Sequence, residues 1–397
     1  MEMRGTNLSH SDHAKRIEAV EEYFTSLSEF SKNGKTYGAL FYCYCTEKMN
    51  EKAMTLFEKM KELNLVSSTL VYNNLISLYM KLDQPEKVPP LVEEMKAANI
   101  LPDKYTYNLL MTSYASLRDI EAVEKVMEEI KANRFVCCDW TTFSNLAGIY
   151  VASGHFNKAN LALKKCEKII NVRDRMAYHY LITLHAGTSN SAAVKRVWKS
   201  LKSAFPKTTN SSYLTMLSSL ARLDDLDGMK KCYEEWESGY LSYDIRLANV
   251  LINYYLRQGL NKEAETLLEN AMNKVSELNF GALEVSIDFY LNTGEMKLAL
   301  KCMESAVNKV KKNEWQPNQE KVGAFLKHFE DQKDIDGAEE FCKMLKKVYR
   351  LNWEEYNALL RTYIAAEKTE PCMRQRMEED EIEMSPETED LLEKVCP

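Results

Sequence analysis

Apolar positions along this chain recur in pairs of short helical patterns separated by polar turns. In the segment 69–103, Leu75, Ile76 and Tyr79 stand at i, i+1 and i+4, which is the spacing of a buried helix face. A second apolar stripe follows the turn and consists of Val88, Leu91, Val92 and Met95. The segment therefore predicts two amphipathic helices joined by a short turn.

Prolines modify the second of these helices. Pro85 suits the first position of a helix, where its missing N–H costs no hydrogen bond. Pro89 and Pro90 lie one turn further on, where a proline removes a hydrogen bond at a cost of about 3 kcal/mol. We therefore expect the second helix of this segment to start late or to kink.

The paired pattern repeats with a period of 35 residues over most of the chain. One landmark near the start of each first helix is aromatic in most units, and it is held in turn by Tyr37, Tyr72, Tyr107, Phe143, Tyr178, Tyr213, Ala248, Leu283, Val322 and Tyr356. A landmark in each second helix is held by Ala53, Val88, Val123, Ala159, Val194, Met229, Ala264, Ala299 and Ala338. Both rows contain the same one-residue and four-residue insertions, so the chain is predicted to be an array of helix-turn-helix repeats.

A single helix pair cannot bury its own apolar face, but stacked pairs bury theirs against one another. We therefore predict an all-α fold, a right-handed superhelical α-solenoid of about ten helix-turn-helix repeats of 35 residues, with the first helices on the concave face. The units are predicted to start near residues 34, 69, 104, 140, 175, 210, 245, 280, 319 and 353. The array is predicted to span 34–387, after an incomplete leading repeat at 13–33 and before an acidic C-terminal cap at 388–397.

The formal net charge of −7 is concentrated near the C-terminus. Residues 378–393 contain nine acidic residues and no Lys or Arg, so the rest of the chain is close to neutral. This balance argues against bulk electrostatic attraction as the main way of binding nucleic acid. The acidic end is expected to be a solvated face or, alternatively, a protein-docking surface.

Several segments resemble the pentatricopeptide repeat. Residues 71–76 (VYNNLI) and 105–110 (YTYNLL) are similar to the opening of its first helix. Residues 57–61 (FEKMK) are similar to the end of its second helix, and 101–103 (LPD) to its closing loop. The Trp and Gly-Tyr pattern of the tetratricopeptide repeat does not occur. The resemblance covers roughly residues 13–387.

By this resemblance each unit would read one base of single-stranded RNA with two or three side chains. The base-reading residue follows the helix-opening landmark, and the last residue of the unit assists it. Carried over by position, the predicted pairs are Asn73 with Asp103, Asn108 with Asp139, Ser144 with Asp174, and Asn249 with Asn279. A carboxamide offers a donor and an acceptor to a base edge while an acidic partner orients it. In the family, Asn with Asp suggests uridine and Asn with Asn suggests a pyrimidine.

The residue two before the landmark helps to clamp bases in this family. By this resemblance, the residues predicted to stack or pack against bases are Leu70, Tyr105 and Met176. Lys81 and Arg257, late in first helices, are assigned to phosphates, as is Arg222.

The remaining units depart from the family's pattern at the base-reading position. The residues there are Gly38, His179, Leu214, Glu284 and Gly323. Gly, Leu and Glu offer poor partners to a base edge, and a carboxylate repels phosphate. About four of nine complete units are therefore predicted to read bases.

A structural role is the alternative for the asparagines, because Asn near a helix start often caps that helix. Asn73, Asn108 and Asn249 share one position in three repeats, which favours the binding role over three separate caps.

No motif for catalysis or metal binding accompanies the repeats. Walker, nucleophile-elbow and zincin patterns do not occur, and none of the ten cysteines forms a CxxC pair. Glu370-Pro371-Cys372 lacks the second cysteine of the deaminase motif that some pentatricopeptide repeat proteins carry. We therefore predict no enzymatic activity, cofactor, metal or small-molecule substrate. The cysteines are expected to be buried free thiols, and no apolar run is long enough to span a membrane.

The predicted function is binding of single-stranded RNA on the concave face, acting on the stability, processing or translation of organellar transcripts. The resemblance implies a mitochondrial location or, alternatively, a plastid one, although no Arg-rich, acid-poor transit segment is visible. The alternative hypothesis is a protein-interaction scaffold with degenerate repeats, possibly within a ribonucleoprotein such as an organellar ribosome.

Overall fold

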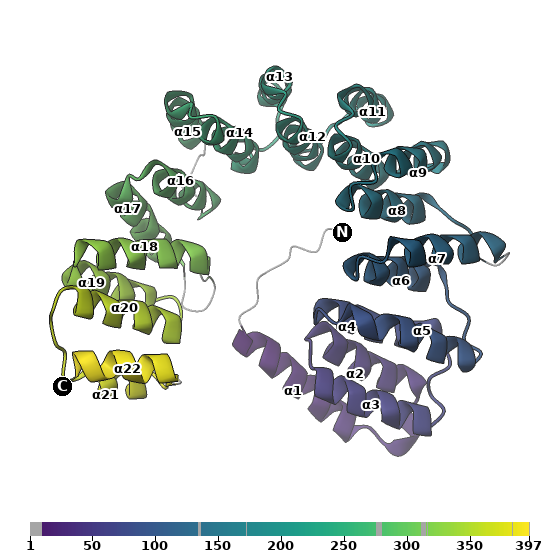
Figure 1. The fold of residues 1–397 in the computed structure, drawn as a ribbon, viewed down its shortest axis with the longest axis horizontal. Helices are drawn as coiled ribbons and strands as arrows, with labels where there is room; N and C mark the ends of the chain where they lie inside the picture. Colours follow the sequence, from purple (N-terminus) through teal and green to yellow (C-terminus); the bar gives the residue numbers. More distant parts are fainter. Residues whose placement is uncertain are drawn as a thin grey trace. The chain divides into compact units, whose positions relative to one another are not determined.

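The fold is that of a computed structural model that describes residues 10–133, 136–171, 173–274, 280–310, 315, 317–382 and 384–396. All regular secondary structure in these residues is helical, which confirms the all-α prediction (Figure 1). The chain divides into two compact units, an N-terminal unit at His10–Trp236 and a C-terminal unit that begins at Glu237. Each unit is a stack of helix pairs.

In the N-terminal unit, first and second helices alternate along the chain (Figure 1). The first helices are α2 (Gly34–Thr46), α4 (Thr69–Lys81), α6 (Lys104–Ser116), α8 (Trp140–Ala152), α10 (Arg175–Gly187) and α12 (Asn210–Arg222). The second helices are α1 (His10–Ser26), α3 (Asn50–Glu62), α5 (Val88–Ala97), α7 (Ile120–Ala132), α9 (Phe156–Ile169), α11 (Ser191–Ala204) and α13 (Leu226–Glu237), with short 3-10 turns η1 (Glu29–Ser31) and η2 (Pro85–Lys87).

The C-terminal unit continues the same alternation. Its first helices are α14 (Ile245–Arg257), α16 (Phe280–Thr293), α18 (Gln319–Gln332) and α20 (Trp353–Ala365). Its second helices are α15 (Asn261–Lys274), α17 (Met296–Val307), α19 (Ile335–Leu345) and α21 (Met373–Glu379), and α22 (Pro386–Val395) follows them. In both units, each first helix begins at the residue at which the sequence pattern starts a repeat.

Neighbouring repeats meet through their first helices, and each second helix packs behind them. Within the N-terminal unit α4 contacts α2 and α6, and α10 contacts α8 and α12. Phe57 of α3 shows how one joint is filled. Its ring lies 5.9 Å from that of Phe41 in its own repeat and 5.6 Å from that of Tyr72 in the next, measured between centroids. All three rings are buried, so the joint is a continuous apolar layer.

The segment 69–103 bears out the apolar pattern and the effect of its prolines. Leu75, Ile76 and Tyr79 of α4 are buried, and so is the apolar stripe of α5. Pro85 opens the 3-10 turn η2, and the α-helix starts only at Val88. Because the helix starts late, Pro89 and Pro90 fall in its first turn, where residues need no intrahelical N–H hydrogen bond.

The last residue of a repeat caps the first helix of the next one. Asp103, Asp139 and Asp174 are the N-caps of α6, α8 and α10, and their carboxylates accept backbone N–H groups of the first turn. Other first helices are capped in the same way by the side chains of Asn33, Thr209, Asp244, Asn318 and Asn352. The residue predicted to assist base reading therefore has a structural role, since such caps stabilise a helix by about 1 kcal/mol.

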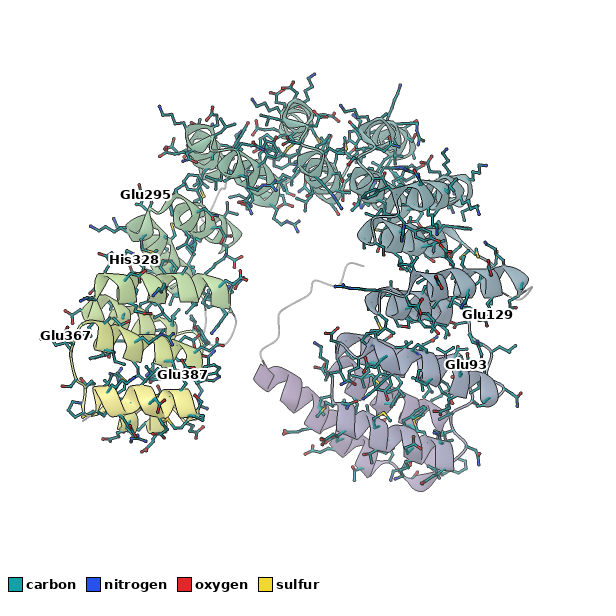
Figure 2. All side chains as sticks on the ribbon, in the orientation of Figure 1. Glu93, Glu129, Glu295, His328, Glu367 and Glu387 are labelled. Carbon is teal, nitrogen blue, oxygen red and sulfur yellow. The ribbon has the colours of Figure 1, made fainter. Side chains whose placement is uncertain are left out.

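Tyrosine, carboxylate and lysine side chains join neighbouring repeats in a recurring arrangement. Tyr107 donates its hydroxyl to Glu129 Oε1 at 2.8 Å, and Nζ of Lys96 from the preceding second helix lies 2.9 Å from the same oxygen. Lys96 also pairs with Glu93, and Figure 2 labels Glu93 and Glu129 on α5 and α7. The arrangement recurs as Tyr72 with Glu94 and Lys61, Tyr213 with Glu235 and Lys202, and Tyr356 with Asp380 and Lys346. The aromatic landmark thus supplies a directed hydrogen bond as well as apolar surface.

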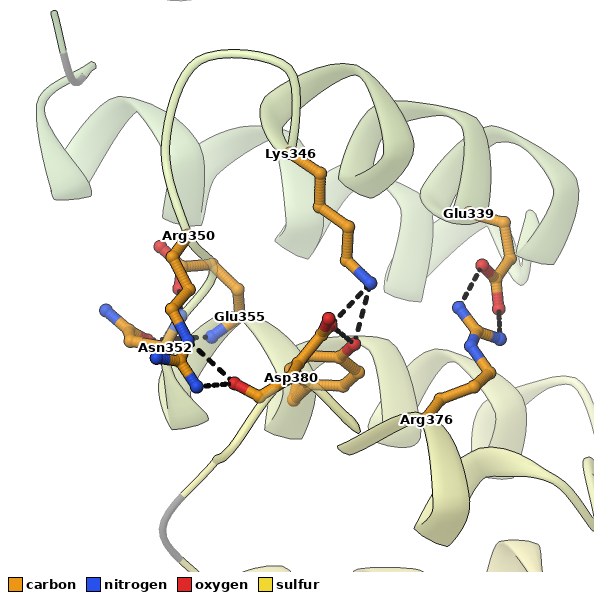
Figure 3. A network of polar contacts seen from close by, with 8 residues as sticks. Glu339, Lys346, Arg350, Asn352, Glu355, Arg376 and Asp380 are labelled. Atoms are coloured by element: carbon orange, nitrogen blue, oxygen red, sulfur yellow. Dashed lines mark hydrogen bonds and ion pairs between the residues drawn. The ribbon is translucent and has the colours of Figure 1, made fainter. Parts of the chain in front are cut away.

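A polar network ties α19, α20 and α21 together in the C-terminal unit (Figure 3). Arg376 donates from both terminal nitrogens to the two carboxylate oxygens of Glu339, at 2.8 Å each. Arg350 donates from Nε to the backbone carbonyl of Asp380 at 2.7 Å. This bidentate and charge-assisted bonding stabilises the end of the helix stack.

All ten cysteines are free thiols, as expected. Burial raises the pKa of Cys45, Cys166 and Cys232 to about 12, so these thiols are inert. The expectation of burial is wrong for Cys137 and Cys372, which are exposed because they lie in turns outside the helical core.

The described residues contain neither a metal-ligating cluster nor a membrane-spanning helix. No group of three or more His, Cys, Asp or Glu side chains there is arranged to hold a metal ion. In the same residues, no helix has the length and apolar character needed to cross a membrane.

Candidate nucleic-acid interface

The first predicted pair, Asn73 and Asp103, comes together across a repeat joint. Asn73 Nδ2 donates to the two carboxylate oxygens of Asp103 at 3.3 and 3.4 Å. Thr106 donates its hydroxyl to Asn73 Oδ1 at 2.8 Å. The amide is thus oriented from both ends, with its nitrogen toward the acid and its oxygen toward the threonine. Asn73 does not cap its own helix. Its structural role is to form hydrogen bonds that join two neighbouring repeats.

The charge state of Asp103 suits this orienting role. Burial by itself raises the pKa of its carboxyl group, but hydrogen bonds from Thr106 and Asn73 outweigh that effect and hold the pKa below its ordinary value. The carboxylate is therefore ionised near neutral pH and accepts hydrogen bonds only.

The second predicted pair, Asn108 and Asp139, is not joined by a hydrogen bond in the described structure. Asp139 instead pairs with Lys104 and accepts the hydroxyl of Thr141 at 2.5 Å. Burial raises the pKa of Asp139, but the Lys104 ammonium and the other donors more than offset this and lower it. Asn108 Oδ1 and Thr142 Oγ1, which are the counterparts of the bonded atoms of Asn73 and Thr106, are buried without a hydrogen-bond partner. The amide of Asn108 is therefore not held by its neighbours.

The remaining predicted pairs differ from the first. Ser144 donates its hydroxyl to the carbonyl of Thr141 at 3.0 Å, and Asp174 caps α10. Asn249 Oδ1 accepts Nδ2 of Asn253 from the same helix at 3.2 Å. Asn279, its predicted partner, lies outside the described residues.

The predicted clamp residues lie on the surface. Leu70 is 65% exposed, Tyr105 54% and Met176 53%. These fractions are high for large apolar side chains, which normally cover core surface. The predicted phosphate contacts Lys81 and Arg257 are exposed at the last positions of α4 and α14, and the Arg257 guanidinium lies 5.8 Å from the Tyr254 ring centroid.

This combination of repeats has counterparts among known proteins. A model of the PPR repeat matches residues 35–65, 105–135 and 211–239, and a model of the PPR repeat family matches residues 67–116. A mitochondrial pentatricopeptide repeat-containing protein of Arabidopsis thaliana is 45% identical to this chain over 410 residues, covering 100% of this chain and 76% of that protein. The chain belongs to the pentatricopeptide repeat family.

Two further relatives bear on this pentatricopeptide repeat protein. The large ribosomal subunit protein mL101 of Arabidopsis thaliana is 44% identical over 407 residues, covering 100% of this chain and 83% of that protein. The crystal structure of the pentatricopeptide repeat protein PPR10 from maize superposes with a TM-score of 0.50 over 96% of this chain and 58% of the maize chain. The identity to maize PPR10 is 13%, so this second likeness is one of fold.

One further residue occupies the predicted base-reading position and was not among the residues predicted from the sequence. Asn357 follows the landmark Tyr356 in α20, is 1% exposed, and makes no hydrogen bond from either amide atom within the described residues. At the next helix, α22, Ser385 is the N-cap and corresponds to Asp103, while Thr388 corresponds to Thr106. The hydroxyl oxygens of Ser385 and Thr388 lie 2.8 Å apart. The Tyr-Asn dipeptide, shared with the repeats that begin at 69 and 104, is the signal that identifies this position.

Histidine replaces asparagine at the predicted base-reading position of the repeat 175–209. His179 Nε2 lies 2.8 Å from Ser212 Oγ, a contact equivalent to that between Asn73 and Thr106. Burial lowers the pKa of His179, and the charge of Arg175 lowers it further. Burial also lowers the pKa of His185 and outweighs its contacts with Glu167, whose carboxylate lies 2.6 Å away.

Because of these two buried histidines, the protein is predicted to become less stable as the pH is lowered. Both stay neutral in the native state near neutral pH, whereas histidines of the unfolded chain take up protons below about pH 6.5. The unfolded state then binds more protons, so the free energy of unfolding is expected to decrease as the pH falls from about 7.5 to 5.5. Urea unfolding midpoints at these pH values test this, with the variant His179→Gln expected to show a shallower decrease than the unmodified protein. A midpoint that rises on acidification would contradict the burial argument.

Proposed function

We propose that this pentatricopeptide repeat protein binds single-stranded RNA along its first helices. The observation that carries the proposal is the orientation of the buried Asn73 amide by Asp103 and Thr106. Beside it in the sequence pattern are two exposed clamp side chains, Leu70 of its own repeat and Tyr105 of the next. A side chain fixed in this way loses little conformational entropy when it meets a base edge. Exposed apolar and aromatic clamps supply the stacking surface that single-stranded RNA requires.

The proposed cellular role is in the mitochondrion, on an organellar transcript. Of two relatives at 44–45% identity, one is a mitochondrial pentatricopeptide repeat-containing protein and the other is a large ribosomal subunit protein. A protein without catalytic motifs would act on RNA by occupancy, shielding it from nucleases or changing its fold in stability, processing or translation. The proposed partner is a single-stranded organellar transcript.

Binding to a pool of short random single-stranded RNAs, at two salt concentrations and with sequencing of the bound fraction, tests the function. We expect Kd to rise with salt, because phosphate contacts release counterions. Asn73→Ala and Asn108→Ala are each expected to weaken binding by about tenfold and to relax the base preference at one position, since a lost base contact costs about 1–3 kcal/mol. Asn270→Ala, an exposed asparagine on the second helix α15, is the matched control and should bind as the unmodified protein does.

Thermal unfolding of the same variants separates folding from binding, because Asn73 also bonds to the next repeat. If Asn73→Ala and Asn108→Ala leave both affinity and base preference unchanged, the base-reading assignment is wrong. If the unmodified protein retains no RNA at low salt, RNA binding itself is wrong.

A protein-interaction scaffold within a ribonucleoprotein is the second candidate. The likeness at 44% identity to a large ribosomal subunit protein favours it specifically. The scaffold function predicts a protein partner that stays bound after nuclease treatment. Affinity purification with and without nuclease tests this, and loss of all partners on digestion would exclude the scaffold in favour of RNA binding.

A further inference from the structure

A neutral hollow opens between α6, α8 and α10, beside the base-reading position of the repeat 140–174. Its volume is about 560 Å³, which falls within the range of about 300–1,000 Å³ usual for ligand sites. Thr141 and Ser144, the clamp and base-reading residues of this repeat, both line it. The hollow is therefore continuous with the surface along which the proposed RNA strand runs.

Two aromatic rings form one wall of the hollow. Trp140, the first residue of α8, and Tyr180 of α10 have ring centroids 5.6 Å apart with planes inclined by 47°. This separation leaves no room for a flat ring between them. Tyr180 is nevertheless 49% exposed, so a large part of its side chain is accessible even though the indole of Trp140 lies beside it.

The rest of the lining selects for a neutral, flat group. None of the described residues that line the hollow is charged, so it offers no partner to a phosphate or an ammonium group. Gly148 lines the hollow, and a Cβ placed there would come no nearer than 3.8 Å to Leu184 Cδ2. Ser144, which is 7% exposed and already donates to a backbone carbonyl, fills little of the space.

From this geometry we propose that the hollow is a nucleobase-stacking pocket, in which one base of the bound strand lies against the exposed side chain of Tyr180. This inference rests on the proposed RNA-binding function and adds to it a contact outside the base-reading and clamp positions. Every base has a π-face, and stacking on a protein ring gives affinity without requiring a hydrogen-bonded edge. In this repeat stacking takes the place of an oriented amide, because the Ser144 hydroxyl is bonded to its own helix.

A single-stranded RNA from the bound pool, with one 2-aminopurine placed in turn at each position, tests the pocket. Stacking quenches the fluorescence of this base, so we expect one position to be quenched in the complex with the full chain. Tyr180→Ala should restore that fluorescence and weaken binding by at least about fivefold. Tyr180→Phe should keep both, because the ring and not the hydroxyl provides the surface.

A blocking variant and a matched control complete the design. Gly148→Leu places a side chain in the hollow without removing Tyr180 and is expected to abolish quenching at the same position. Tyr23→Ala removes a tyrosine that is 66% exposed on α1 and should change nothing. RNA that binds with unchanged affinity and unchanged quenching to both Tyr180→Ala and Gly148→Leu would overturn the pocket while leaving the RNA-binding function in place. Absence of RNA binding by the unmodified protein would overturn both.

Discussion

Replacing Phe57 by Ala is expected to lower the free energy of unfolding of the first helix pairs by about 3–5 kcal/mol. The Phe57 ring is 1% exposed and fills the joint between two repeats, in contact with Phe41 and Tyr72. Its loss would leave a cavity that neither neighbour can close, because both rings are anchored in their own helices. The estimate combines the lost transfer free energy with the cost of that cavity.

The loss at Phe57 should stay local. In a repeat protein each unit contacts only its neighbours, so stability is close to a sum over units and joints. Amide hydrogen exchange is expected to accelerate in α1, α2 and α3 and to change little beyond α6. Urea unfolding should show an early transition that the unmodified protein lacks.

Phe156→Ala is the matched control for this substitution. Phe156 opens α9, and 49% of its surface is exposed. Its removal should change stability by no more than about 0.5 kcal/mol, as for most surface positions. Equal effects of the two substitutions would show that the ring at the joint contributes no special packing.

Replacing Glu355 by Ala is expected to destabilise the C-terminal unit by about 3 kcal/mol. Glu355 is 1% exposed, and its carboxyl oxygens accept Gln319 Nε2 at 2.8 Å, the Tyr349 hydroxyl at 3.1 Å and the backbone N–H of Asn352 at 2.6 Å. Figure 3 shows Glu355 beside Asn352 at the start of α20. Removing the acceptor leaves the buried Tyr349 hydroxyl and the half-buried N–H of Asn352 without this partner, and each unpaired buried donor costs about 1–3 kcal/mol.

The hydroxyl of Tyr349 is the most sensitive of these donors. Burial raises its pKa, and the neighbouring Glu355 raises it further, so the group remains a protonated donor at any ordinary pH. Glu354→Ala is the control, because Glu354 is the exposed neighbour on the same turn and accepts only a 3.2 Å bond from Gln319. Thermal unfolding and exchange in α18 and α20 measure both variants, and an effect of Glu355→Ala no larger than that of the control would refute the network's role.

The candidate interface was only partly accessible from sequence. The repeat frame placed Asn73 and Asp103 at positions that meet, and they do meet. The same frame assigned Asp139 to Asn108, yet Lys104 occupies that carboxylate. Lys104 lies one helical turn before Asn108 and competes with it for the Asp139 carboxylate through its positive charge. Aligning the repeats by position does not reveal this competition.

The amino-acid sequence was enough to predict the helices, their pairing into repeats and the residue at which each first helix begins. These features follow from local spacing, because the 3.6-residue helix period and the 35-residue repeat both show in the spacing of apolar residues along the sequence. Which side chains meet across a joint became evident only in the folded chain, as for Thr106 with Asn73 and Trp140 with Tyr180. Those contacts join different repeats, so they depend on how closely neighbouring helices pack and on which donor reaches an acceptor first.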